Sequence, residues 1–334
     1  MVGWIKSSGG IYAIKEFFQT MKDGTKIAVT RWIPDDEEKI KGLIQLSHGM
    51  MEHSLRYDKI GSIFAENGFV FSAHDHRGHG KTAYTAEQKG IGTFGKLSDK
   101  DGFNIVTEDL KEIIGKLKED FPNKNTILMG HSFGSFVAQN FIELYGNEIS
   151  GCILCGSAGP RKVAVGFLRF VTSLVILFKG RNFRSALIRS LAFTGYNKKI
   201  PEVITGIEWL SRNPQNVDLY LKDAWCGGTA TLSFYRDLTT GLSLIHKNSS
   251  MKNIPKALPI FIIAGEDDPV GGYGKSLKKL KNIYLKNGMT KIELKLYPLD
   301  RHEIFNEEDG ENAVSDVIDW ISANIRPVSS VSYR

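Results

Sequence analysis

Cysteine is scarce in this chain, with three residues among 334. The odd count of Cys152, Cys155 and Cys226 argues against the disulfide framework that small secreted domains use. Cys152 and Cys155 have the C-x-x-C spacing that occurs in zinc and redox sites. They lie, however, inside the apolar run 149–156, and no second pair follows. The expected role of this segment is therefore a buried strand.

Long blocks of like charge are absent as well. The 43 Lys and Arg residues exceed the 37 Asp and Glu residues by only six, without a run of five or six like charges. This mild excess does not indicate nucleic-acid binding, although it permits weak attraction to an anionic membrane surface. Residues 1–10 lack the continuous apolar segment of a secretory signal, so we expect a cytoplasmic protein.

Apolar runs long enough to cross a membrane are also missing. The apolar stretch 163–178 is too short for a span and contains Arg169. The 42% hydrophobic composition instead predicts a globular protein with a large buried core. The length fits one large α/β domain with an insertion, or two ordinary domains.

Strand-like and helix-like segments alternate through most of the chain. Two antiparallel strands come first, around the turn at 22–24. Helical patterns separate the later strands, which is typical of a mostly parallel sheet with helices on both faces. The expected strands are 11–17, 25–32, 43–46, 69–73, 126–129, 149–155, 258–264 and 292–297, and the clearest helices are 103–121, 136–144 and 311–325.

The alternation stops in the middle of the chain. From about position 161 to position 247 the pattern is helical, without a clear strand. We interpret residues 159–247 as a helical cap inserted into a core made of residues 1–158 and 248–334. Open α/β folds bind their ligands beyond the carboxyl ends of the strands, so we expect the cap to cover that edge of the sheet.

The segment GHSFG, residues 130–134, follows an expected strand and precedes an expected helix. Strand, sharp turn and helix form the context in which a serine between two glycines acts as a nucleophile. The glycines let the backbone pass through a strained turn where a β-carbon would clash. Ser132 is therefore the candidate catalytic nucleophile.

A serine hydroxyl needs a general base, and the base needs an acid that orients it. His302 is the last histidine of the chain and stands just beyond the last expected strand, which makes it the candidate base. Glu266, Asp267 and Asp268 crowd the loop after the strand 258–264. We predict that Asp268 is the acid, with Asp267 as the alternative.

The developing oxyanion needs two backbone N–H donors. The residue after the nucleophile, Phe133, is expected to supply one of them. The second is expected from the loop after the strand 43–46, where Met50 is the candidate. We expect His48 and Glu52 to brace this loop rather than to touch the substrate.

Five motifs carry a resemblance to a known family. In these motifs the chain resembles the α/β-hydrolase superfamily and, within it, the monoacylglycerol lipase and lysophospholipase-like group with its serine aminopeptidase S33 type of domain. The motifs span nearly the whole chain outside the insertion. They are 48–57 (HGMMEHSLRY), 75–80 (DHRGHG), 130–134 (GHSFG), 265–270 (GEDDPV) and 301–303 (RHE).

The resemblance implies an α/β-hydrolase fold and a serine hydrolase without cofactor or metal. The implied substrate is a carboxylic ester of a single acyl chain, a monoacylglycerol or a lysophospholipid, and the apolar insertion would supply surface for that chain. The alternatives are a short-chain carboxylesterase and a peptidase or amidase with the same triad. Met51 stands where the family often has a second glycine, so we expect a narrower entrance or a changed chain-length preference.

Two segments have competing interpretations. Residues 74–79 (HDHRGH) place four candidate metal ligands within six positions, but without an H-E-x-x-H helix or another ligand cluster we interpret them as a structural loop. Basic residues at 161, 162, 179, 181 and 184 flank the apolar stretch 163–178. We interpret that stretch as a cap helix that also binds an anionic membrane surface, with a purely soluble cap as the alternative.

Overall fold

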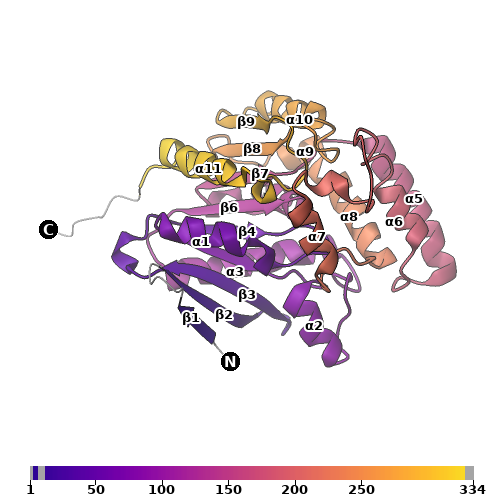
Figure 1. The fold of residues 1–334 in the computed structure, drawn as a ribbon, viewed down its shortest axis with the longest axis horizontal. Helices are drawn as coiled ribbons and strands as arrows, with labels where there is room; N and C mark the ends of the chain where they lie inside the picture. Colours follow the sequence, from indigo (N-terminus) through magenta and orange to yellow (C-terminus); the bar gives the residue numbers. More distant parts are fainter. Residues whose placement is uncertain (1–2, 7–11, 328–334) are drawn as a thin grey trace.

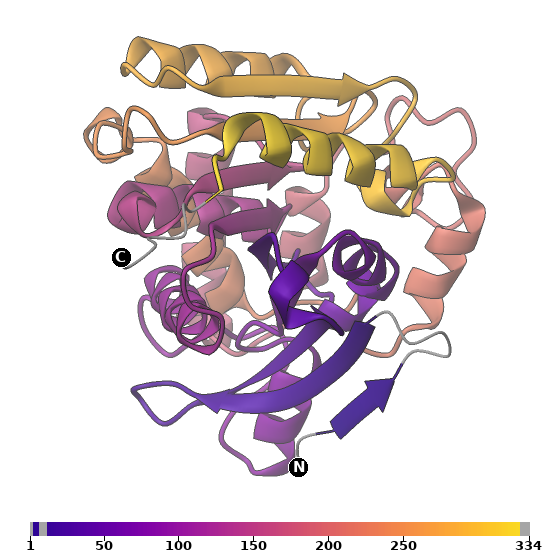
Figure 2. The ribbon, with the colours of Figure 1, turned by 90° about the vertical axis from the view of Figure 1, so that its left-hand side faces the viewer.

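The computed structural model describes residues 3–6 and 12–327. The strands within these residues form a single sheet in the order β1-β2-β3-β5-β4-β6-β7-β8-β9 (Figures 1 and 2). Strands β1 to β3 run antiparallel, and β4 to β9 are parallel to one another. The strands are β1 (Gly3–Lys6), β2 (Tyr12–Thr20), β3 (Lys26–Pro34), β4 (Gly42–Ser47), β5 (Phe69–His74), β6 (Thr126–His131), β7 (Gly151–Cys155), β8 (Ile260–Gly265) and β9 (Ile292–Tyr297).

Helices cover both faces of the sheet, as the alternating pattern predicts. Successive residues of a strand point to opposite faces, so Leu128 packs into one apolar core while Ile127 and Met129 pack into the other. Helices α3 (Gly102–Asp120), α4 (Phe133–Tyr145) and α10 (Lys275–Lys286) pack into the first core. The second core receives α1 (Asp58–Glu66) and α11 (Gly310–Asn324).

The C-x-x-C pair lies in β7, in agreement with the buried strand that the sequence predicts. Both Cys152 and Cys155 are fully buried. Three positions along a strand reverse the side-chain direction, so Cys152 belongs to one core and Cys155 to the other. Their thiols therefore lie on opposite faces of the sheet and do not form a pair.

Between β7 and β8 the chain leaves the sheet and forms helices. They are α5 (Lys162–Lys179), α6 (Ala186–Ala192), α7 (Pro214–Lys222), α8 (Leu232–Ile245) and α9 (Asn248–Met251). Residues 159–247 contain no strand. Helix α8 packs against α3 and α4 of the core and against α5, which lies at the outer edge of the molecule (Figure 1).

The sequence patterns did not predict two elements. Strand β1 extends the sheet by pairing antiparallel with β2, and helix α2 (Gly80–Gln88) follows the motif 75–80. Helix α2 has few buried positions, Gly80, Thr82 and Ala83, so it lacks the apolar stripe that makes a helix visible in a sequence. Position 11 of the first expected strand lies outside the described residues. None of the described helices has the length and apolarity that crossing a membrane requires.

Candidate active site

Ser132 occupies the sharp turn between β6 and α4. Its backbone has φ 50° and ψ −116°, a conformation that few residues other than glycine adopt. The Ser132 N–H donates a hydrogen bond to the Cys155 carbonyl oxygen on β7 (3.0 Å), which holds the turn against the sheet. The strain of this conformation is kept because the strand and the helix on either side fix the chain.

The two glycines around Ser132 are required by close packing. A β-carbon on Gly134 would overlap the carbonyl group of Ser47 on β4. A β-carbon on Gly130 would lie 2.5 Å from the Gly134 carbonyl oxygen. Neither glycine has a positive φ, whereas Ser132 does. The strained residue is thus the serine itself, and the glycines let neighbouring backbone approach it.

His302 and Asp268 meet at the carboxyl edge of the sheet. The His302 Nδ1 atom lies 3.1 Å from Asp268 Oδ2, and both side chains are almost completely buried. Neither atom has another hydrogen-bond partner among the described residues, so each is available to the other. The second oxygen of Asp268 accepts a hydrogen bond from the Val270 N–H (2.8 Å). Asp267, the alternative acid, is partly exposed, and its N–H donates to the Asp300 carbonyl oxygen.

Two cavities meet at Ser132. The first, of about 340 Å³, is lined by Ser132 and His302 and by polar side chains that include Arg189 and Ser190. The second, of about 360 Å³, is lined by Ser132 and by a mainly apolar wall. That wall includes Phe133, Phe136, Leu168, Leu191, Phe193, Leu238, Leu242 and Val270, from the core and from the segment between β7 and β8.

Met50 and Phe133, the candidate oxyanion donors, flank this junction. Met50 lines both cavities, and Phe133 lines the second. Phe133 is the first residue of α4, so its N–H has no partner within the helix. Neither backbone N–H donates a hydrogen bond to another described residue. Both groups can therefore bind an oxygen atom of a ligand.

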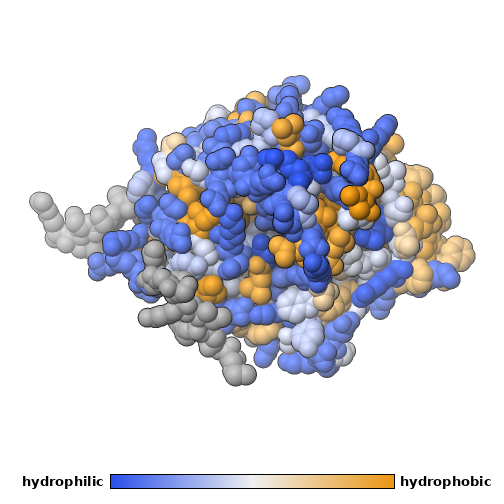
Figure 3. Space-filling model, viewed as in Figure 1, coloured by the Kyte–Doolittle hydropathy of each residue, from blue (hydrophilic) through white to orange (hydrophobic). Residues whose placement is uncertain are grey.

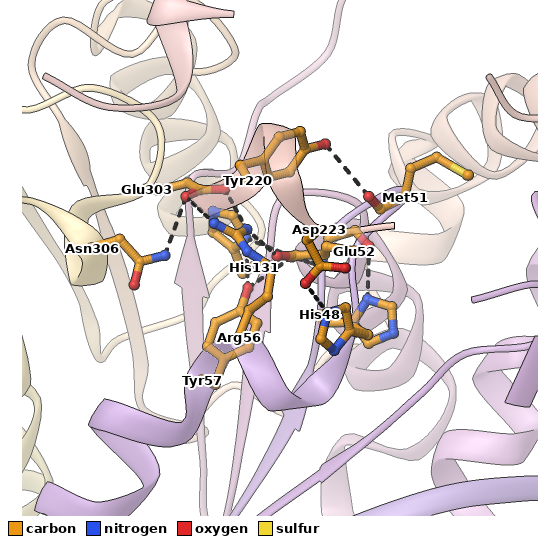
Figure 4. A network of polar contacts seen from close by, with 12 residues as sticks. His48, Met51, Glu52, Arg56, Tyr57, His131, Tyr220, Asp223, Glu303 and Asn306 are labelled. Atoms are coloured by element: carbon orange, nitrogen blue, oxygen red, sulfur yellow. Dashed lines mark hydrogen bonds and ion pairs between the residues drawn. The ribbon is translucent and has the colours of Figure 1, made fainter. Parts of the chain in front are cut away.

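A buried network braces the loop that carries Met50 (Figure 4). Glu52 accepts hydrogen bonds from the Gly49 N–H, from the Tyr57 hydroxyl (2.8 Å) and from the Arg56 guanidinium (2.8 Å). The same guanidinium pairs with Glu303 (2.7 Å), the residue after His302. The network thus joins the loop after β4 to the loop after β9. Glu52 braces its loop as the sequence analysis expects, although it also lines the first cavity.

His131, the residue before Ser132, is part of this network. Its Nδ1 lies 2.9 Å from the Tyr57 hydroxyl oxygen and 3.3 Å from Glu52 Oε1. Burial would raise the pKa of Glu52, but the His131 hydrogen bond and the Arg56 charge hold that pKa well below its usual value. Burial would lower the pKa of His131, but the hydrogen bond and charge of Glu52 raise it. Each side chain therefore favours the charged form of the other.

Sequence reasoning did not assign roles to Arg56, Tyr57, His131 and Glu303. All four lie inside the motifs 48–57, 130–134 and 301–303. The sequence feature that could have identified them is a charged, imidazole or hydroxyl side chain within those motifs. The sequence does not show that these motifs meet, because Arg56 and Glu303 are 247 positions apart.

The histidines of segment 74–79 pack against the start of the loop that carries Met50. The His76 N–H donates to His48 Nε2 (3.0 Å), and the His76 ring contacts both the His74 ring nitrogen (3.2 Å) and the Ser47 hydroxyl (3.1 Å). Burial lowers the pKa of His74 to about 3 and that of His79 to about 4. These rings are neutral packing elements, as the structural interpretation of 74–79 expects.

Known proteins resemble this chain over most of its length. The family described as serine aminopeptidase, S33 matches residues 38–309. The monoacylglycerol lipase of Mycolicibacterium smegmatis is 26% identical, over 90% of this chain and 95% of that protein. The monoglyceride lipase of Rattus norvegicus is 25% identical, over 91% of this chain and 89% of that protein. A highly thermostable carboxyl esterase from Bacillus coagulans superposes with a TM-score of 0.85 at 28% identity, covering 94% and 99%.

The extent of the family match agrees with the resemblance that the five motifs carry, because residues 38–309 contain all of them. The TM-score of 0.85 over 94% of this chain shows that the superposed esterase shares its fold. The chain belongs to the serine aminopeptidase S33 family of α/β-hydrolases, within the monoacylglycerol lipase and lysophospholipase-like group.

Proposed function

We propose that this protein hydrolyses carboxylic esters of single-acyl lipids through a covalent acyl-enzyme. Ser132 attacks the ester carbonyl while His302 takes its proton, and Asp268 orients the imidazole and stabilises its charge. The N–H groups of Met50 and Phe133 bind the oxyanion. His302 then protonates the departing alcohol and activates the water that releases the fatty acid.

The position of Ser132 between two unlike cavities carries this proposal. The apolar cavity suits an acyl chain, which gains about 0.8 kcal/mol for each methylene removed from water. The cavity that contains Glu52, Arg189 and Ser190 suits the alcohol part of the ester. The names of the two lipase relatives support monoacylglycerol as the first substrate to test. Lysophospholipid, the other single-acyl ester that the motifs imply, is the second.

We also propose that residues 159–247 act as a cap, with the core formed by residues 1–158 and 248–334. Side chains from α5, α6 and α8 line the apolar cavity, and Arg189 and Tyr220 line the other. The cap therefore builds much of both cavities, while the proposed catalytic side chains come from the core. Substrate choice is then a property of the cap, and chemistry a property of the core.

The test is fatty-acid release from a monoacylglycerol and from a lysophosphatidylcholine with the same acyl chain, beside short-chain aryl esters. We expect the long-chain monoacylglycerol to have the highest kcat/KM, and Ser132→Ala to abolish turnover of every ester. Activity of Ser132→Ala equal to that of the wild type would overturn the assignment of the nucleophile.

A short-chain carboxylesterase is the second candidate, because the superposed Bacillus coagulans protein is a carboxyl esterase. The same assay separates the two. Cleavage of short aryl esters alone would leave the catalytic assignment in place and replace the lipid substrate with a small ester.

We further propose that α5 docks on an anionic membrane surface. Its outward side chains are apolar and exposed, with Val163 at 88%, Phe170 at 62% and Phe178 at 84%. Figure 3 shows hydrophobic side chains gathered at the edge of the molecule where Figure 1 places α5 and α6. Basic residues at both ends of α5 complement anionic headgroups, which is typical of interfacial helices.

Sedimentation with vesicles of phosphatidylcholine and phosphatidylserine at low salt tests this docking. We expect the wild type to pellet with the vesicles, and the double variant Phe170→Asp, Phe178→Asp to bind at least about tenfold more weakly, because it loses two apolar anchors. Ile91→Asp, at an exposed apolar position near the end of α2, is the matched control and should bind like the wild type. Wild-type protein that stays in the supernatant would contradict the proposal.

A further inference from the structure

His53, Asp223 and Cys226 form a cluster of three side chains able to bind a metal ion. One donor atom of each lies within 4.8 Å of the others. Among the described residues, this is the one group of three or more such donors from His, Cys, Asp and Glu. His53 belongs to the loop after β4, whereas Asp223 and Cys226 follow α7. The cluster therefore connects the core to the inserted segment, which carries Asp223 beside the bracing network (Figure 4).

One ring nitrogen of His53 faces a carboxylate oxygen of Asp223. Its Nε2 lies 2.7 Å from Asp223 Oδ2, and its side chain is 7% exposed. The other ring nitrogen, Nδ1, is buried and has no hydrogen-bond partner among the described residues. A cation bound between Nε2 and Oδ2 would replace the proton that these two atoms share, and Nδ1 would carry the ring proton, because a metal-binding imidazole is neutral.

Cys226 is the accessible thiol of the protein. It is half-buried and forms no disulfide, whereas Cys152 and Cys155 are completely buried in β7. Burial raises the pKa of the Cys226 thiol, so the sulfur carries its proton while no cation is bound. On binding a cation the sulfur coordinates as the thiolate, and the proton passes to solvent.

The charges around the cluster favour a cation. The carboxylates of Glu52 and Glu303 act on Cys226 together with that of Asp223. The opposing charge is Arg56, which is already paired with Glu52 (2.8 Å) and Glu303 (2.7 Å). The net charge of these four side chains is negative, because three carboxylates face one guanidinium.

We propose that His53, Asp223 and Cys226 bind one soft divalent cation, with Zn²⁺ as the expected ion. Imidazole and thiolate donors select Zn²⁺ over Mg²⁺ and Ca²⁺, which prefer oxygen ligands. Three protein ligands and one water complete a tetrahedral site. Bonds of about 2.0–2.3 Å then place donor atoms about 3.3–3.7 Å apart. The observed separations bracket this range, because His53 Nε2 and Asp223 Oδ2 are 2.7 Å apart and all three donor atoms lie within 4.8 Å of one another.

The bound ion strengthens an existing link between the two parts of the chain. The Gly227 N–H, next to Cys226, already donates to the Met51 carbonyl oxygen (3.0 Å), and Met51 follows the candidate oxyanion donor Met50. The cation therefore fixes the inserted segment to the loop that carries Met50, beside the first cavity, which Met51 and Gly227 line.

A titration of the metal-free, full-length protein with Co²⁺ tests the site. We expect one equivalent of Co²⁺ to produce a thiolate-to-metal charge-transfer band, and Zn²⁺ to displace the Co²⁺ and remove the band. The band reports on Cys226, since the other two cysteines are buried. Cys226→Ser should abolish it, and Asp223→Asn should weaken Co²⁺ binding by at least about tenfold.

Asp218→Asn is the matched control, because Asp218 is an exposed carboxylate on α7 that pairs with Lys222. This variant should bind Co²⁺ like the wild type, and circular dichroism should show every variant folded. The proposal is overturned by a wild type that shows no band, by a band that persists in Cys226→Ser, or by equal weakening in Asp218→Asn and Asp223→Asn.

Discussion

At the scale of single residues, burial and direction separate side chains that look equivalent in the sequence. Glu266, Asp267 and Asp268 are consecutive carboxylates, yet only Asp268 is completely buried with an oxygen facing His302. In a buried site a carboxylate next to an imidazole stabilises the positive charge that forms during proton transfer. A carboxylate that faces solvent stabilises that positive charge only weakly, because water screens the interaction.

Asp268→Asn tests this distinction. We expect kcat/KM to fall by about 10³–10⁴-fold, because the amide favours the wrong imidazole tautomer and supplies no charge. Steady-state kinetics on an ester that the wild type cleaves provide the measurement. Asp267→Asn is the matched control and should have little effect. A larger loss in Asp267→Asn than in Asp268→Asn would exchange the roles of the two residues.

At the scale of elements, buried neutral histidines lie at the carboxyl ends of the central strands β4 and β5. His74 ends β5, and His79 precedes α2. The pKa of His79 is about 4 in the folded protein, lowered by burial from 6.5. Between pH 6.5 and about pH 4 the unfolded chain therefore binds a proton at this residue that the native protein does not bind. Native stability is lost as the pH falls through this window.

Urea unfolding at several values between pH 7 and pH 5 measures this effect. We expect the free energy of unfolding to fall by up to about 1.4 kcal/mol per pH unit for each such histidine. His79→Gln, which cannot titrate, should reduce the slope of the unfolding free energy against pH by the contribution of one histidine, up to about 1.4 kcal/mol per pH unit. An unchanged slope in the variant would show that His79 is protonated equally in both states.

At the scale of the whole molecule, Arg56 connects three distant parts of the chain. Its guanidinium contacts Glu52 in its own loop, Glu303 beside His302, and the Asn216 side chain on α7 (3.1 Å). Both carboxylates are almost completely buried. Such a group holds the loop after β4 and the loop after β9 against the inserted helices, and its charge is needed because two buried anions share it.

Arg56→Met should therefore destabilise the protein by about 3–5 kcal/mol, because Glu303 would lose its ion pair while buried and Glu52 would keep only His131 as a partner. Urea unfolding at pH 7 provides the measurement. The control is Lys59→Met, whose partner Glu311 is 67% exposed and whose ion pair is worth less than about 1 kcal/mol. Similar losses in the two variants would contradict the proposed role of the network.

Much of the fold follows from local patterns. Alternating strands and helices predict the layered sheet, and the helical pattern after position 161 predicts the insertion. Strand β1 and helix α2 were missed for a physical reason. Helix α2 buries little apolar surface, and β1 is four residues long at the edge of the sheet, so neither leaves a strong periodic signal.

The sequence by itself determined the candidate nucleophile and its turn, because a strand, two glycines and a helix specify that geometry within ten residues. It also determined the order in which Ser132, Asp268 and His302 follow their strands. Only the tertiary structure decided that Asp268 faces His302, that Arg56 lies between Glu52 and Glu303, and that His53 meets Asp223 and Cys226. Backbone preferences are set by near neighbours in the chain, whereas these contacts depend on how loops after different strands converge at one edge of the sheet.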